Sequence, residues 1–128
     1  MTPDLVIFDC DGVLVDSETI SNSVLSESLE TVGLNITPEA CMDLFLGKSW
    51  NYCFHVIKKR LGTEPPHSLY ETYMKKLFVE FEKNLNPIED VQFALDEITH
   101  PKCVASSGSH LKINKTLSIT GLLERFGE

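Results

Sequence analysis

Two aspartates, Asp9 and Asp11, stand two residues apart directly after a short apolar run that ends at Phe8. Carboxylates at this spacing are able to divide the work of phosphoryl transfer between them. One attacks phosphorus as a nucleophile, and the other exchanges a proton with the attacking or leaving oxygen. Because a carboxylate and a phosphoryl group repel each other, such a site requires a divalent cation, and Mg²⁺ with oxygen ligands is the natural choice.

A second polar cluster, Ser106-Ser107-Gly108-Ser109, follows another short apolar stretch near the carboxyl end of the sequence. We expect the Ser106 hydroxyl to hold a phosphate oxygen, with backbone N–H groups between Ser107 and Ser109 adding dipolar support. The alternative is that Ser106 is an ordinary turn or capping residue. Ser109 is expected to cap the helix that follows.

Both clusters are expected at the carboxyl ends of parallel strands. Residues 5–8 form an uninterrupted, partly β-branched apolar run, as expected of a strand that is covered on both faces. Ligands bind beyond the carboxyl ends of strands in open α/β sheets, and Gly12 lets the backbone turn away at that point. A second buried strand is expected over residues 102–105, paired in parallel with the first.

Apolar residues recur at helical spacing through most of the remaining sequence. Between the strands, the spacing predicts helices over residues 17–32, 50–61 and 67–84, a short one that starts at Pro38 and stops before Gly47, and another that Pro87 opens. Thr37 and Ser49 are expected to cap two of these helices, and Gly62 to end one. The predicted architecture is an α/β fold with a helical insertion. Because a two-stranded parallel sheet is a poor core by itself, part of the core is expected to be missing.

The composition sets limits on the class of protein. The 128 residues are 42% hydrophobic, which is ordinary for one globular unit. The net charge of −8 disfavours nonspecific binding of nucleic acid. The cysteines lack metal-ligand spacing, no secretory signal precedes the first strand, and no apolar stretch is long enough to span a bilayer. We expect a soluble, cytoplasmic protein with reduced thiols.

The sequence resembles the haloacid dehalogenase-like hydrolases, specifically the phosphatases and phosphomutases with a helical cap inserted after the first strand. The stretch Phe-Asp-Cys-Asp-Gly-Val-Leu-Val-Asp-Ser-Glu at residues 8–18 is similar to the first motif of that family. The stretch Val-Ala-Ser-Ser-Gly at residues 104–108 is similar to the second. Residues 101–108 look closest to 6-phosphogluconate phosphatase-like members, and beta-phosphoglucomutase-like members share the same motifs.

The resemblance implies a fold and a set of roles. Residues 1–16 and 85–128 would form an incomplete Rossmann-like core, and residues 17–84 an all-helical cap. Asp9 would be the phosphoryl-accepting nucleophile and Asp11 the general acid/base. Mg²⁺ would be held by the Asp9 carboxylate and the Asp11 backbone carbonyl, and Ser106 would bind the transferred phosphoryl group.

Three weaker candidates have an ordinary structural alternative beside the functional one. The backbone N–H of Cys10 is expected to point at phosphate, while its thiol is only a small side chain. Glu18 either contacts substrate or is a first-turn glutamate that suits the helix dipole. Lys48, by the resemblance, lies in the substrate-specificity loop of the cap, and otherwise is a solvated loop residue.

The sequence also departs from the family pattern. Members continue with a basic residue, usually lysine, and an acidic motif that completes the metal site, and neither is present in these 128 residues. Lys112 and Lys115 lie too near Ser106 to be assigned the missing role. Relatives often carry glycine at the position of Asp90.

The resulting hypothesis is a Mg²⁺-dependent phosphatase that acts on a small phosphorylated metabolite, a sugar phosphate or sugar-acid phosphate, through an aspartyl-phosphate on Asp9. A phosphomutase shares every residue named. A third hypothesis is an inactive fragment that self-associates through exposed core edges. A calcium loop is disfavoured because Gly12 is the fourth residue from Asp9 rather than the sixth. Dehalogenation is disfavoured because, by the resemblance, those enzymes lack the second aspartate.

Overall fold

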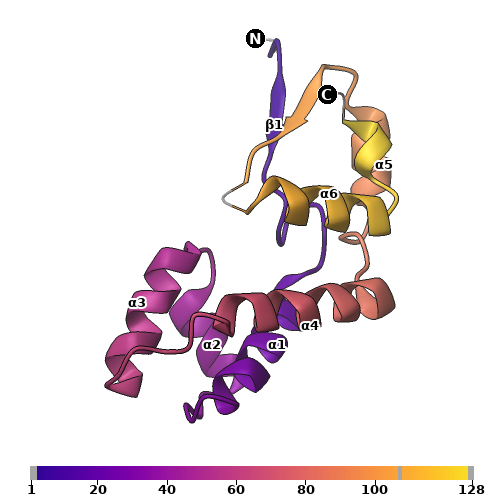
Figure 1. The fold of residues 1–128 in the computed structure, drawn as a ribbon. Coiled ribbons are helices and arrows are strands. Elements are labelled where there is room, and N and C mark those ends of the chain that lie inside the picture. Colours follow the sequence, from indigo (N-terminus) through magenta and orange to yellow (C-terminus); the bar gives the residue numbers. More distant parts are fainter. Residues whose placement is uncertain (1–2, 107, 127–128) are drawn as a thin grey trace. The chain divides into compact units, whose positions relative to one another are not determined.

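A computed structural model of the protein describes residues 3–106 and 108–126. The chain divides into two compact units, which Figure 1 shows as a ribbon. The first, here called the strand unit, consists of Met1–Ser17 and Phe81–Glu128. The second, the helical unit, is Glu18–Glu80.

The strand unit is built on two parallel strands, β1 (Val6–Phe8) and β2 (Lys102–Val104). Val6 is in register with Lys102, and Phe8 with Val104. The helices α5 (Val91–Glu97) and α6 (His110–Ile119) and the short 3-10 helix η1 (Leu123–Arg125) complete the unit. The parallel pairing and the mixed α/β architecture predicted from the sequence are confirmed.

The burial of β1 differs from the prediction of a strand covered on both faces. Side chains alternate between the two faces of a strand, so Ile7 and Phe8 point in opposite directions. The Phe8 ring meets the ring of Phe126 edge to face at a centroid distance of 5.9 Å. Ile7, on the other face, is 61% exposed. The prediction is therefore wrong for Ile7 and for Leu5, which is 46% exposed, because the described residues leave this face open to solvent.

The segment that follows β1 turns back and pairs with residues after α4 (Leu69–Asn84). Gly12 has φ 76°, which confirms that this turn uses the left-handed conformation that glycine adopts readily. Val15 then forms a bridge with Pro87, and Ile88 N–H donates to the Leu14 carbonyl at 3.0 Å. Because Pro87 lies in this pairing, it does not open a helix as predicted. Helix α5 begins at Val91 instead.

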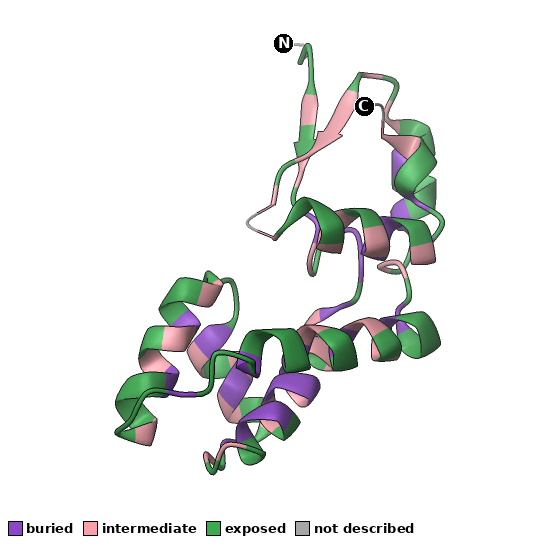
Figure 2. Ribbon diagram, viewed as in Figure 1, coloured by how far each residue is buried: buried purple, intermediate pink, exposed green. Residues whose placement is uncertain are grey.

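The helical unit holds α1 (Glu18–Glu30), α2 (Pro38–Phe45), α3 (Trp50–Leu61) and most of α4 (Leu69–Asn84). Thr37 Oγ1 accepts from Ala40 N–H and Ser49 Oγ from Tyr52 N–H, each at 3.2 Å, so both predicted caps are confirmed. Gly62 ends α3 at φ 78°. Figure 2 shows buried positions on every helix of this unit, and among the most deeply buried are Leu29, Cys41, Ile57 and Leu77.

Candidate active site

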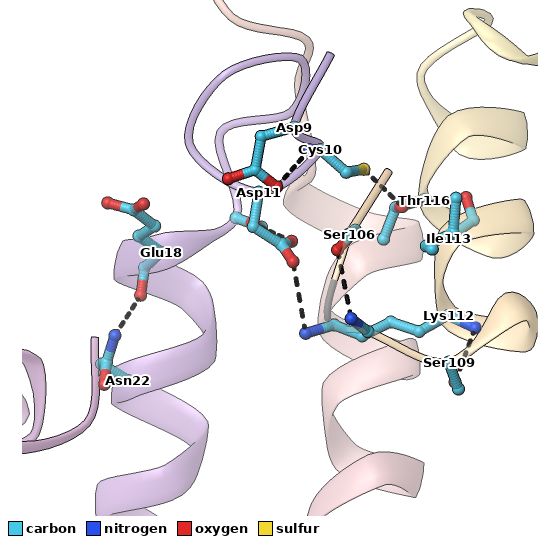
Figure 3. A network of polar contacts seen from close by, with 12 residues as sticks. Asp9, Cys10, Asp11, Glu18, Asn22, Ser106, Ser109, Lys112, Ile113 and Thr116 are labelled. Atoms are coloured by element: carbon cyan, nitrogen blue, oxygen red, sulfur yellow. Dashed lines mark hydrogen bonds and ion pairs between the residues drawn. The ribbon is translucent and has the colours of Figure 1, made fainter. Parts of the chain in front are cut away.

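Asp9 and Asp11 directly follow β1, at its carboxyl end (Figure 3). Asp9 is exposed, and its Oδ1 accepts a hydrogen bond of 2.8 Å from the backbone N–H of Cys10. Asp11 is half-buried, and its Oδ1 accepts a bond of 2.7 Å from the Ser17 hydroxyl. The two carboxylates therefore differ: one is open to solvent, and the other is held by a neighbouring side chain.

Cys10 lies between the aspartates with its side chain turned inward. The residue is 1% exposed, and its Sγ is 3.7 Å from the Thr116 hydroxyl of α6. Burial raises the pKa of the Cys10 thiol, which suits a packed side chain rather than a nucleophile. Its backbone N–H is engaged by Asp9, so the phosphate contact predicted for this N–H would require that bond to be exchanged.

Ser106 follows the end of β2 and lies in a tight turn. Its Oγ accepts from Gly108 N–H at 3.1 Å, which is the ordinary turn contact of a serine. That bond uses an oxygen lone pair and leaves the O–H group able to donate to an anion. Ser107, also predicted to bind phosphate, lies outside the described residues. Ser109 caps α6 as predicted, because its Oγ accepts from Lys112 N–H at 3.2 Å.

Lys112 was not assigned a role from the sequence, because it lies close to Ser106 along the chain, but in the structure it lies near Asp11. The Lys112 Nζ is 3.8 Å from Asp11 Oδ2, with 21% of the lysine side chain and 33% of the aspartate side chain exposed. Figure 3 shows the lysine reaching across from α6 toward the aspartate. The sequence did hold information that could have identified Lys112: the residue lies in the first turn of the helix that follows β2. Because β2 pairs with β1, that turn is brought to the edge of the sheet where Asp11 lies.

Glu18 and Lys48, the two predicted substrate contacts, belong to the helical unit. Glu18 begins α1, and its backbone carbonyl accepts from Asn22 Nδ2 at 2.8 Å. Lys48 Nζ is 5.4 Å from the centre of the Tyr52 ring, a cation–π contact. Glu18 thus lies in the first turn of α1, where a glutamate suits the helix dipole. The substrate contacts predicted for Glu18 and Lys48 stay predictions.

Asp9 and Asp11, with a side-chain carboxylate and a backbone carbonyl respectively, supply oxygen donors for a metal ion at this edge of the sheet. Within residues 3–106 and 108–126, no three His, Cys, Asp or Glu side chains gather as a cation site. Mg²⁺ is commonly bound by one or two carboxylates and keeps several of its waters, so the two aspartates fit part of such a site.

Among the described residues, no helix is both long and apolar enough to cross a bilayer.

Known proteins resemble this chain in sequence and in fold. The chain is 30% identical to a 6-phosphogluconate phosphatase of Escherichia coli K12 over 126 residues, 94% of the chain and 55% of that protein. A haloacid dehalogenase-like protein of unknown function from Agrobacterium tumefaciens C58 is 34% identical with a TM-score of 0.81, over 98% of this chain and 57% of its own. A HAD family hydrolase from Deinococcus radiodurans R1, solved with bound phosphate and sodium, is 26% identical with a TM-score of 0.66, over 98% and 56%.

These relatives extend well beyond the matched part, because the chain spans a little over half of their length. The match covers both strands, the helices between them and the residues at the carboxyl ends of the strands. The model of one family, described as haloacid dehalogenase-like hydrolase, matches residues 6–128. This chain belongs to the haloacid dehalogenase-like hydrolases.

Proposed function

We propose that this protein is a Mg²⁺-dependent phosphatase that hydrolyses a small phosphorylated metabolite through an aspartyl-phosphate on Asp9. The observation that carries the proposal is the pair Asp9 and Asp11 at the carboxyl end of β1, the strand that pairs with β2 just before Ser106. Crevices at this end of parallel strands are the usual ligand sites of open α/β sheets.

The hydrogen bonds of Asp9 indicate which of its oxygens attacks. Oδ1 accepts the Cys10 N–H, which leaves Oδ2 as the oxygen that approaches phosphorus. In the proposed first step, a bond forms between Oδ2 and phosphorus while the ester P–O bond breaks. Asp11, carrying a proton on its carboxyl group, gives that proton to the departing oxygen.

The second step releases phosphate. Asp11, now ionised, takes a proton from a water molecule as the water oxygen attacks phosphorus. The bond between phosphorus and the Asp9 oxygen breaks, and both carboxyl groups return to their starting states. The Ser106 O–H group donates to a non-bridging phosphate oxygen in both steps and holds the phosphoryl group in place.

The carboxylate of Asp9 and the backbone carbonyl of Asp11 would hold Mg²⁺. When bound, the ion supplies positive charge that offsets the repulsion between carboxylate and phosphate. The Deinococcus radiodurans relative binds phosphate and sodium, which supports a fold that accepts an anion together with a cation. The name of the Escherichia coli relative favours a sugar phosphate or sugar-acid phosphate as substrate. In this proposal residues 17–84 act as a cap, with Lys48 and Glu18 contacting substrate.

The test uses protein expressed from the complete reading frame that encodes this chain. Hydrolysis of para-nitrophenyl phosphate is measured with Mg²⁺ and after removal of divalent cations by EDTA. Asp9→Asn is expected to lower kcat by at least about 100-fold, because an amide is a poor nucleophile toward phosphorus. Asp4→Asn is the matched control, since Asp4 is an exposed aspartate that precedes β1. Unchanged turnover in Asp9→Asn would refute the mechanism.

The same preparation separates the alternatives. A phosphomutase would interconvert isomers of a sugar phosphate without net release of inorganic phosphate. The hypothesis that these 128 residues are inactive by themselves and self-associate is tested by assaying the chain alone and measuring its mass in solution. Mg²⁺-dependent turnover by the isolated chain at enzyme-like rates would contradict that hypothesis.

A further inference from the structure

We propose that Lys112 is a positioning residue for Asp11, an inference that rests on the proposed function. Asp11 must give and take a proton at one point in space, so the direction of its carboxyl group matters. The torsion that turns a carboxyl group about its own axis is intrinsically broad. Contacts from other residues must therefore hold the group in place.

The two oxygens of Asp11 have different partners on different segments of the strand unit. Oδ1 accepts from the Ser17 hydroxyl at 2.7 Å, and Oδ2 faces Lys112 Nζ at 3.8 Å. Ser17 is 1% exposed and precedes α1, whereas Lys112 belongs to α6. A carboxylate held at one oxygen from each side has less freedom to rotate than one held at a single oxygen.

Local structure holds Lys112 where it can do this. Its backbone N–H donates to the capping hydroxyl of Ser109, which fixes the residue in the first turn of α6. The side chain passes close to the turn after β2, where Cδ lies 3.7 Å from the position a Cβ would take on Gly108. The lysine stem is thus packed along the turn that also carries Ser106, and only its end reaches Asp11.

Lys115, on the same helix, provides the comparison. It has the same charge and the same flexible stem, but its Nζ pairs with Glu82 Oε1 at 2.8 Å. It is more exposed than Lys112, at 39% against 21% of the side chain. A substitution at Lys115 therefore removes one positive charge from α6 without touching Asp11, and serves as the matched control.

The kinetic experiment compares Lys112→Met with Lys115→Met in protein from the complete reading frame, assayed with para-nitrophenyl phosphate and Mg²⁺. We expect Lys112→Met to lower kcat about tenfold with KM changed less than about twofold, since general acid–base catalysis contributes roughly 100-fold or more and only part of it depends on orientation. Lys115→Met is expected to leave both constants unchanged. Lys112→Arg, which keeps the charge, is expected to recover kcat to within about threefold of the parent.

Two further measurements separate positioning from other roles. In an Asp11→Asn background, Lys112→Met is expected to change residual kcat less than about twofold, because a residue that acts through Asp11 has nothing left to position. In the substrate-free protein, the carbon-13 resonance of the Asp11 carboxyl group is expected to move on Lys112→Met and to stay in place on Lys115→Met. Circular dichroism and thermal unfolding of each variant, compared with the parent, show that the variants fold.

Several results would overturn the inference. Equal kinetics for Lys112→Met and the parent, or an Asp11 resonance that does not respond to Lys112→Met, would do so while leaving the proposed function intact. A rise in KM with kcat unchanged would show that Lys112 binds substrate instead. A parent protein that hydrolyses no phosphate ester would overturn the proposed function and this inference with it.

Discussion

The helical unit buries apolar side chains on each of its helices, whereas the strand unit leaves one strand partly open. Leu29 of α1 and Ile57 of α3 are both 0% exposed. In the strand unit, Leu14 and Leu117 are as well buried, yet Ile7 in the middle of β1 is 61% exposed. Helical periodicity thus predicted burial well, because apolar residues at helical spacing form one stripe, and that stripe is the face that the helix buries. The partners of a strand face come from distant segments, so an apolar strand sequence does not show which face is covered.

The largest expected effect is on the free energy of unfolding, when one apolar side chain is truncated in each unit. This pair of variants tests the comparison directly. Leu29→Ala should lower the free energy of unfolding by about 2–5 kcal/mol, because it opens a cavity in a closed core. Ile7→Ala should change it by less than about 0.5 kcal/mol, because that side chain lies mostly in solvent. Urea unfolding followed by circular dichroism measures both. An equal loss in Ile7→Ala would mean that Ile7 is covered in solution.

A smaller effect distinguishes Cys41, a buried cysteine of the helical unit, from a buried side chain that carries no titratable proton. Burial, with a smaller contribution from Cys53, raises the pKa of the Cys41 thiol from 9.0 to about 11. Above pH 9.0 the unfolded chain loses this proton while the folded protein keeps it, so the folded state loses stability as pH rises toward 11. The stability difference between the parent and Cys41→Ala should therefore shrink by about 1 kcal/mol between roughly pH 8 and pH 10.

Leu29→Ala is the control for that pH series. Leu29 is 0% exposed and its side chain carries no proton that titrates, so the difference in stability between this variant and the parent should stay constant over the same range. The measurement is a set of urea unfolding curves at stepped pH. A constant difference for Cys41→Ala would show that the Cys41 thiol titrates alike in the folded and unfolded states.

An effect of similar size concerns two residues with left-handed backbone conformation, one in each unit. Gly62, at the end of α3, has φ 78°, and Asp90, before α5, has φ 65° without a capping bond from its side chain. Asp90→Gly should raise the free energy of unfolding by up to about 1 kcal/mol, because glycine adopts this conformation without steric cost. Gly62→Ala should lower the free energy of unfolding by about 1 kcal/mol, because alanine is strained in the left-handed conformation. No atom lies near the new Cβ, so no steric clash adds to that cost.

Thermal unfolding of the two variants checks this pair. Asp90→Ala removes the negative charge but keeps a Cβ, so it should not stabilise the protein. This variant separates the effect of backbone strain from the effect of charge. A gain in Asp90→Ala equal to that in Asp90→Gly would assign the effect to charge.

The sequence by itself determined those features that depend on contacts within a few residues. Thr37, Ser49 and Ser109 cap helices through bonds to N–H groups three residues away, so their roles were readable from local pattern. The short apolar run before Asp9 and the one before Ser106 likewise predicted both strands, their parallel pairing and the carboxylates at the strand end. The family inferred from these motifs is the family whose model matches residues 6–128.

Only the tertiary structure decided features that join distant segments. Pro87, expected to open a helix, pairs with Val15 instead, and helix α5 begins later. Lys112, rejected on its spacing from Ser106, reaches Asp11 because β2 and β1 are neighbours in the sheet. The physical reason is the same in both cases: periodicity and capping report on one element at a time, whereas a pair of side chains from two elements meets only once the sheet has brought those elements together.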